Sequence, residues 1–218
     1  MSAITITNLT KKYGALTAVD NLNLTIDKGE LFALLGMNGA GKTTTIKMLS
    51  CLIKPTYGDA VLLGDSINGN SNAVKQKSNM SPQETAVAPN LTVLENLELI
   101  AGIYGQNAET SRKSAKEMSS QFGLYDVLSK KAKTLSGGMQ RRLSIAMALI
   151  SNPQILFLDE PTLGLDVLAR RKLWASIKQL KNKVTIILTT HYLEEVEALS
   201  DRIGVMTKGN LTAVGTMA

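Results

Sequence analysis

Several features are scarce in this chain, and each shortage excludes a class of protein. Its 218 residues include one cysteine, Cys51, so no internal disulfide can form and a reducing cytosol is the expected setting. No uncharged apolar run approaches the roughly 18 residues that a membrane-spanning helix needs. Residues 1–9 alternate apolar and polar like a strand, so we expect no signal peptide. If the protein serves a membrane, we expect it to act from the surface.

The charge is mildly positive and spread along the chain. There are 24 Lys and Arg against 18 Asp and Glu, which gives a net charge of +6 and a pI of about 9.4. This surplus suits a nucleotide or the anionic face of a membrane. It is too diffuse to indicate nucleic acid, so we expect no nucleic-acid partner. Apolar residues make up 44% of the chain, which is enough for a packed core.

One stretch carries a specific chemical signature. Residues 36–43 read Gly-Met-Asn-Gly-Ala-Gly-Lys-Thr, the pattern of a phosphate-cradling loop. The loop follows the apolar run 31–35, a predicted strand, and precedes 44–49, a predicted helix, which is the context that the motif requires. A glycine-rich structural turn is the alternative, and the Lys-Thr pair with these flanks disfavours it. The residues expected to bind nucleotide here are Gly36, Asn38, Gly39, Ala40, Gly41, Lys42, Thr43 and Thr44.

The chemistry of this loop follows from its backbone. Glycines allow the N–H groups to turn toward an anion, and the helix N-terminus adds partial positive charge. We expect Lys42 to reach the β- and γ-phosphates of ATP and the Thr43 hydroxyl to hold Mg²⁺.

The rest of the chain has an α/β pattern interrupted by a helical block. Apolar alternation or short apolar runs predict strands at 4–9, 19–26, 31–35, 61–64, 155–158, 184–188, 203–206 and 211–214. Helical spacing predicts helices at 44–49, 91–100, 108–122, 143–150, 168–181 and 194–199, and residues 68–72 read as a polar loop. We expect a mixed, largely parallel core sheet with an antiparallel β region, formed by 1–82 and 153–218. Residues 83–152 are expected to form an inserted α-helical subdomain.

A second motif completes the predicted site. The apolar run 155–158 ends in Asp159 and Glu160, which is the shape of a strand that delivers carboxylates beside a phosphate loop. Asp159 would hold Mg²⁺, and Glu160 could orient and deprotonate a water for attack on the γ-phosphate. A helix-capping acidic pair before Pro161 is the alternative.

A second helix start of the anion-binding kind lies between these motifs. Residues 135–142 read Leu-Ser-Gly-Gly-Met-Gln-Arg-Arg, with Ser136, Gly137 and Gly138 before a helical run. A plain N-cap is the alternative. Two such starts fit one nucleotide poorly, but they make sense if the second serves a nucleotide held by another copy.

Together these motifs resemble the ATP-binding subunit of an ATP-binding-cassette (ABC) transporter over essentially the whole chain. Leu135–Gly138 match the family's specific Leu-Ser-Gly-Gly element, and the resemblance implies a P-loop NTPase fold of the ABC type. It also implies roles for four further residues. Tyr13 would stack on adenine, Gln83 would sense Mg²⁺ and the γ-phosphate, Asp166 would belong to the D-loop, and His191 would be the switch histidine that contacts the γ-phosphate.

Three of these four assignments have a plainer alternative. Tyr13 could be an ordinary loop aromatic, Gln83 a solvated loop residue and His191, the sole histidine, a cap or filler. His191 follows a predicted parallel strand at its carboxyl end, where ligands gather. One departure from the family pattern is Met139, which stands where a glutamine is commonest, with Gln140 after it.

The resemblance implies two copies paired head to tail around two ATP with Mg²⁺, driving separate integral membrane permease subunits from the cytoplasmic face of the cell membrane. The segments 81–84, 91–97 and 191–202 resemble exporters of drugs, antibiotics, lipids or ions. The alternative is a soluble ABC ATPase of a non-transport system such as cofactor assembly. A binding-only module is disfavoured because both Glu160 and His191 are present.

Overall fold

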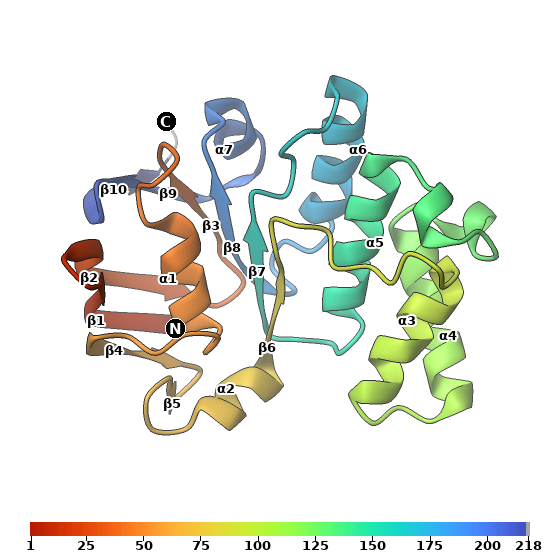
Figure 1. The fold of residues 1–218 in the computed structure, drawn as a ribbon, viewed down its shortest axis with the longest axis horizontal. Helices are drawn as coiled ribbons and strands as arrows, with labels where there is room; N and C mark the ends of the chain where they lie inside the picture. Colours follow the sequence, from red (N-terminus) through yellow and green to blue (C-terminus); the bar gives the residue numbers. More distant parts are fainter. Residues whose placement is uncertain (217–218) are drawn as a thin grey trace.

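Two sheets make up the α/β part of the computed structural model, which describes residues 1–216 (Figure 1). The first sheet is antiparallel throughout and has the strand order β2-β1-β4-β5. Its strands are β1 (Ser2–Tyr13), β2 (Leu16–Asp27), β4 (Tyr57–Leu62) and β5 (Asp65–Ser66). This is the predicted antiparallel β region, and β1 with β2 forms a hairpin that leads into the phosphate loop.

The second sheet has six strands in the order β10-β9-β3-β8-β7-β6. All its neighbours are parallel except β10, which runs antiparallel to β9. The strands are β3 (Leu31–Leu35), β6 (Ser78–Ser81), β7 (Ile155–Asp159), β8 (Thr185–Thr190), β9 (Arg202–Thr207) and β10 (Asn210–Thr216). Leu35 pairs with Thr190, and Asp159 pairs with Thr189. The carboxyl ends of β3, β7 and β8 are therefore level with one another, and ligands bind at such an edge.

The two faces of this sheet serve two cores, because successive side chains of a strand point to opposite faces. Phe32 and Phe157 join the core that contains the antiparallel sheet and α1 (Lys42–Leu49). Leu31 and Leu156 join the core on the other face. The second core also contains residues of α3 (Val93–Ile103), α5 (Gly137–Leu149), α6 (Val167–Lys178) and α7 (Leu193–Leu199).

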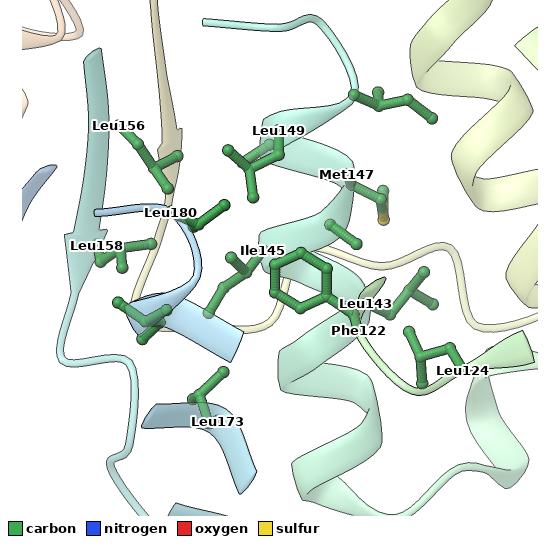
Figure 2. Close-up of a cluster of buried hydrophobic side chains, with 14 of the residues drawn as sticks. Phe122, Leu124, Leu143, Ile145, Met147, Leu149, Leu156, Leu158, Leu173 and Leu180 are labelled. Atoms are coloured by element: carbon green, nitrogen blue, oxygen red, sulfur yellow. The ribbon is translucent and has the colours of Figure 1, made fainter. Parts of the chain in front are cut away.

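The helical region 83–152 stands at one end of the molecule (Figure 1). It contains α3, α4 (Ala108–Gln121), two short 3₁₀ turns at Tyr125–Val127 and Ala132–Thr134, and α5. Helix α5 lies between the sheet and the other helices, so that Leu143 and Phe122 belong to the same cluster as Leu156 and Leu158 (Figure 2). The α-helical region therefore shares a continuous apolar core with the sheet through α5.

The sequence missed or misplaced a few elements. Helix α2 (Ser71–Lys77) begins inside the predicted loop 68–72, and the edge strand β6 was not expected. Both have few apolar residues: Val74 is the buried residue of α2, and β6 lies at the sheet edge with a polar sequence. Helix α5 begins at Gly137, six residues before the predicted range, because Ser136 caps it. No helix among residues 1–216 is long and apolar enough to cross a membrane.

Candidate nucleotide-binding site

A cavity of about 410 Å³ opens at the carboxyl edge of the core sheet, beside the phosphate loop. Its lining includes the loop residues Asn38–Thr44, the polar residues Gln83 and Glu160, and Tyr13, Leu16 and Ala18 from the first two strands. The structure thus brings together the predicted phosphate-loop, adenine-stacking and hydrolytic residues from four separate parts of the sequence. His191 and Asp159 contact residues of this lining from behind.

The phosphate loop has the backbone conformation that anion binding needs. Gly41 has a φ of 104°, which favours glycine, and it precedes α1 without a side-chain cap. The N–H groups of Lys42, Thr43 and Thr44 lie in the first turn of α1, where a helix has no intrahelical acceptors for them. A Cβ at Gly41 would lie 2.4 Å from the Ala18 carbonyl oxygen. These N–H groups and the helix dipole form a cradle that fits a phosphate.

Lys42, Glu160 and His191 form a linked group of charged side chains. Lys42 Nζ lies 3.1 Å from Glu160 Oε1 and donates a hydrogen bond of 2.7 Å to the Gly36 carbonyl. His191 Nδ1 lies 2.8 Å from Glu160 Oε2. Lys42 is 5% exposed and Glu160 is 5% exposed, so water screens the pair weakly. The Glu160 carboxylate is therefore held on both oxygens.

The backbone of Glu160 is strained. Its φ is 46°, in the left-handed region that non-glycine residues rarely occupy. The Glu160 N–H donates to the carbonyl and hydroxyl oxygens of Thr189 on the neighbouring strand. Such strain gathers at functional sites when the surrounding contacts impose it.

Asp159 and Thr43 form the arrangement expected of a magnesium site that also uses phosphate oxygens. Asp159 Oδ1 accepts hydrogen bonds from the Thr43 hydroxyl at 3.0 Å and from the Thr189 hydroxyl at 2.6 Å. Among residues 1–216, no group of three or more acidic, histidine or cysteine side chains could hold a metal by itself. One carboxylate with one hydroxyl beside a phosphate cradle fits Mg²⁺, which usually keeps several waters and takes oxygens from the substrate.

The two outer residues of the site are exposed. Tyr13 is 49% exposed at the end of β1, with Lys11 Nζ 5.2 Å from its ring centre. Its ring borders the cavity and is open to a stacking partner. The Gln83 side chain is exposed and borders the cavity from the loop after β6.

The second helix start does not line this cavity. Ser136 caps α5 by accepting a hydrogen bond from Met139 N, and both Ser136 and Gly137 are exposed. Gly138 faces α6, because a Cβ there would lie 2.9 Å from the Ala169 Cβ. Asp166 caps α6 by accepting from Ala169 N at 2.8 Å. Gly138 and Asp166 thus both lie near Ala169 at the start of α6. Neither Asp166 nor residues 136–138 line the cavity that contains the phosphate loop of the same copy.

The departure from the family pattern at Met139 has a structural counterpart. The Met139 side chain is partly buried and packs against the apolar core. Gln140 Nε2 donates to the Leu135 carbonyl at 3.2 Å and so fixes the chain just before Ser136.

Two buried charged residues near the site were missed by the sequence reasoning. Arg141 is 4% exposed and donates to four carbonyl groups around Asp159 and Gln83. Glu195 is fully buried, accepts from Trp174 Nε1 at 3.2 Å, and has its pKa raised by burial. Arg141 comes three residues after the Leu-Ser-Gly-Gly element at 135–138, which we call the signature. Its neighbour Arg142 is also an arginine, so the sequence gives no sign of which of the two is buried.

Comparisons with known proteins find similarity over most of the chain. A family model described as "ABC transporter" matches residues 19–163. The chain is 42% identical over 209 residues to the probable multidrug ABC transporter ATP-binding protein YbhF of Escherichia coli (strain K12). It is 42% identical over 210 residues to the linearmycin resistance ATP-binding protein LnrL of Bacillus subtilis (strain 168). These alignments cover 95% and 96% of this chain, which spans 36% of the first relative's length and 68% of the second's.

A solved structure is similar over nearly its full length. The dimeric post-hydrolysis state of the ATP-binding cassette MJ0796, bound to ADP and Pi, matches with a TM-score of 0.88 and 30% identity, covering 99% of both chains. The predicted fold class, an α/β cassette with a mixed sheet and an antiparallel β region, is confirmed by this similarity and by the two sheets described above.

Proposed function

Because this chain belongs to the ABC transporter family, we propose that it is an ATP-hydrolysing cassette that works as a dimer and drives a separate membrane subunit. The observation that carries the proposal is the contact of Glu160 with both Lys42 and His191, beside Asp159 and Thr43 at one sheet edge. These groups supply a base, a phosphate-binding cation, a hydrogen-bonding imidazole and metal ligands. A cavity that also contains an exposed aromatic ring fits a nucleoside triphosphate.

ATP binding uses the cradle and the ring. The N–H groups at the start of α1 and the Lys42 ammonium bind the β- and γ-phosphates, while Tyr13 stacks on the base. When phosphate oxygens reach Lys42, they compete with Glu160 Oε1 for the ammonium. Binding of the nucleotide therefore releases one oxygen of the Glu160 carboxylate.

Hydrolysis follows from that release. Glu160 accepts a proton from a water whose oxygen attacks the γ-phosphorus, and the bond from phosphorus to the bridging oxygen breaks to give ADP and phosphate. His191 donates a hydrogen bond to the γ-phosphate as charge develops, and Lys42 stabilises the same charge. Thr43 and Asp159 would hold Mg²⁺, which would neutralise phosphate charge, and Gln83 would lie beside this ion and the γ-phosphate from its loop.

A second copy completes each site. Ser136 and Gly137 are exposed and lie outside the cavity of their own chain, although the start of α5 can bind an anion. Large apolar side chains are also exposed in α6, the helix that Gly138 faces, and just before it: Leu163 is 41% exposed, Val167 63% and Leu168 70%. Head-to-tail pairing would cover these side chains and place Ser136, Gly137 and Gly138 with Asp166 against the partner's ATP, giving two equivalent sites.

The membrane partner docks on another face. A groove of about 270 Å³ lies between the edge strand β6 and the helical region, lined by Met80, Ile100, Ile103, Tyr104 and Met147 among others. Ile103 is 69% exposed and Tyr104 is 45% exposed, so the groove offers apolar surface to an amphipathic helix. Residues 83–152 act as the moving subdomain, with the Gln83 loop as the hinge at its border.

The direction of transport is outward, with drugs or antibiotics as the cargo. This rests on the names of two similar proteins, a probable multidrug ABC transporter ATP-binding protein and a linearmycin resistance ATP-binding protein. The chain then works at the cytoplasmic face of the cell membrane. A soluble ATPase of cofactor assembly is the second candidate, and it would leave the Ile103–Tyr104 groove without a membrane partner.

The test measures hydrolysis and assembly together. The purified chain should hydrolyse ATP with Mg²⁺, and the rate should rise with the square of protein concentration at low concentration. Replacing Ile103 and Tyr104 by serine should leave that activity unchanged but abolish co-purification with the permease in detergent. A chain that hydrolyses ATP and retains the permease after these substitutions would contradict the docking face, and a monomer with full activity would contradict the shared site.

A further inference from the structure

Arg141 is the only side chain in the described part of the chain that donates to carbonyl groups on both sides of Glu160 and to the Gln83 loop. Its Nε donates to the Pro161 carbonyl at 2.9 Å and its Nη2 donates to the Asp159 carbonyl at 2.7 Å. Its Nη1 donates to the carbonyls of Pro82 and Gln83. One guanidinium thus joins the signature helix α5, the end of β7 and the loop after β6.

This position is costly for a charge, so it needs a specific reason. Arg141 is 4% exposed, and burial lowers its pKa to about 10, which leaves it charged at neutral pH. A buried cation is tolerated only when its donors are satisfied. Here the acceptors are main-chain carbonyls. Unlike side-chain carboxylates, they cannot move independently of the backbone. The guanidinium therefore fixes the path of three backbone segments relative to α5.

The segments that Arg141 joins are those that carry the hydrolytic groups. Glu160 lies between the two carbonyls of Asp159 and Pro161 and has a φ of 46°. Gln83 contributes its own carbonyl to Arg141 while its side chain borders the cavity. Because α5 begins with Ser136–Gly138, any movement of that helix acts on both segments through a planar, five-donor group.

We propose that Arg141 is a positioning residue that couples the signature helix to Glu160 and Gln83 of the same chain. This inference rests on the proposed function, in which Ser136–Gly138 contact ATP held by the second copy. That contact sets the position of α5. Through its hydrogen bonds, Arg141 then sets the positions of the Glu160 carboxylate and of the Gln83 loop. The second copy thereby controls hydrolysis at the first copy's own ATP.

The chain contains a matched control in the next residue. Arg142 lies on the same helix, and its Nη1 donates to the carbonyls of Phe122 and Gly123 at 2.7 and 3.2 Å. Successive residues of a helix point about 100° apart, so Arg142 faces the end of α4 and not the site. Removing either arginine removes one charge and two or more carbonyl contacts, but only Arg141 contacts the hydrolytic segments.

The experiment compares Arg141→Lys and Arg141→Met with Arg142→Lys and Arg142→Met in the full chain. Three quantities are measured: kcat with Mg²⁺-ATP, the Kd of a fluorescent ATP analogue in EDTA, and hydrogen exchange of the amides at 83–85, 160 and 162–165. Lysine keeps the charge but loses the fork that spans three segments. We expect kcat to fall about 30-fold or more for Arg141→Lys while Kd changes less than about threefold, the signature of lost transition-state positioning. Exchange at 83–85, 160 and 162–165 should quicken, and both Arg142 variants should keep kcat within about threefold.

The outcomes separate the possible failures. If Arg141→Met does not fold, Arg141→Lys decides, because a lysine ammonium can still satisfy part of the buried acceptor set. A folded Arg141→Lys with wild-type kcat overturns the inference, as does an equal loss of kcat in the Arg142 variants. A parallel loss of ATP binding and kcat also overturns it, since that would indicate a general structural role. Absence of hydrolysis by the wild-type chain would instead contradict the proposed function.

Discussion

His191 Nδ1 lies 2.8 Å from Glu160 Oε2, although the two residues are 31 positions apart in the sequence. The contact exists because Glu160 follows β7 and His191 follows β8, and these strands are parallel neighbours whose ends are level. Lys42 contacts the other oxygen of the same carboxylate. In the proposed mechanism, nucleotide binding competes for Lys42 and so releases this oxygen of Glu160.

Replacing Glu160 by glutamine should separate binding from hydrolysis. The amide keeps a similar shape and can still contact Lys42 and His191, but it cannot accept a proton from water. We expect kcat to fall about 100-fold or more, while ATP binding and ATP-dependent dimers on a sizing column persist. Glu194 is exposed on α7, and Glu194→Gln is the control that should keep wild-type activity. Turnover at the wild-type rate in Glu160→Gln would exclude Glu160 as the base.

Replacing Gly137 by aspartate should block hydrolysis without damaging the monomer. No heavy atom lies within 4 Å of a Cβ at Gly137, so the fold has room for the side chain. The carboxylate would repel the phosphates of ATP held by the partner. We expect the Kd of the single chain for ATP to stay within about threefold while kcat falls about 100-fold, from loss of transition-state contacts. Equal losses of both would mean that the ATP site is not shared between copies.

The phosphate loop should respond differently to alanine at its two left-handed glycines. A Cβ at Gly41 would lie 2.4 Å from the Ala18 carbonyl oxygen, whereas a Cβ at Gly39 has no neighbour within 4 Å. Gly39→Ala therefore bears only the backbone strain, about 1 kcal/mol, while Gly41→Ala adds a steric clash and should lower the free energy of unfolding by about 3 kcal/mol. Urea titrations followed by Trp174 fluorescence measure both. Equal losses at the two positions would contradict the close contact with Ala18.

Glu195 should make stability depend on pH in a defined direction. Burial raises its pKa, so the folded chain binds a proton more tightly than the unfolded chain does. Stability is then unaffected below the ordinary pKa of glutamate and falls as the pH rises through the raised pKa of Glu195. Glu195→Gln removes this loss, so its melting temperature should exceed that of the wild type by more at high pH than at low pH.

The exposed Glu194→Gln variant serves as the control for this pH series as well. Its melting temperature should follow that of the wild type, because the Glu194 side chain is exposed on α7 and substitutions at exposed positions usually change stability little. If the difference in melting temperature between the wild type and Glu195→Gln stayed constant across the series, the pKa of Glu195 would be the same in the folded and unfolded chains, which would contradict the prediction.

The sequence alone determined the parts of this protein that local chemistry specifies. The glycines and Lys42-Thr43 of residues 36–43 predict a phosphate loop because their backbone freedom and charge act over a few residues. The apolar run before Asp159 and Glu160 predicts a buried strand for the same local reason. The motif order further identified the family, and the comparisons agree with it.

Only the tertiary structure decided which side chains meet and which arginine is buried. The contact between His191 and Glu160 depends on the level ends of β7 and β8, and the strain at Glu160 depends on its hydrogen bonds to Thr189. Arg141 and Arg142 are identical in sequence terms, but the rotation of α5 against the sheet turns one into the site and the other toward α4. Such choices come from packing between segments distant in sequence, which no local pattern records.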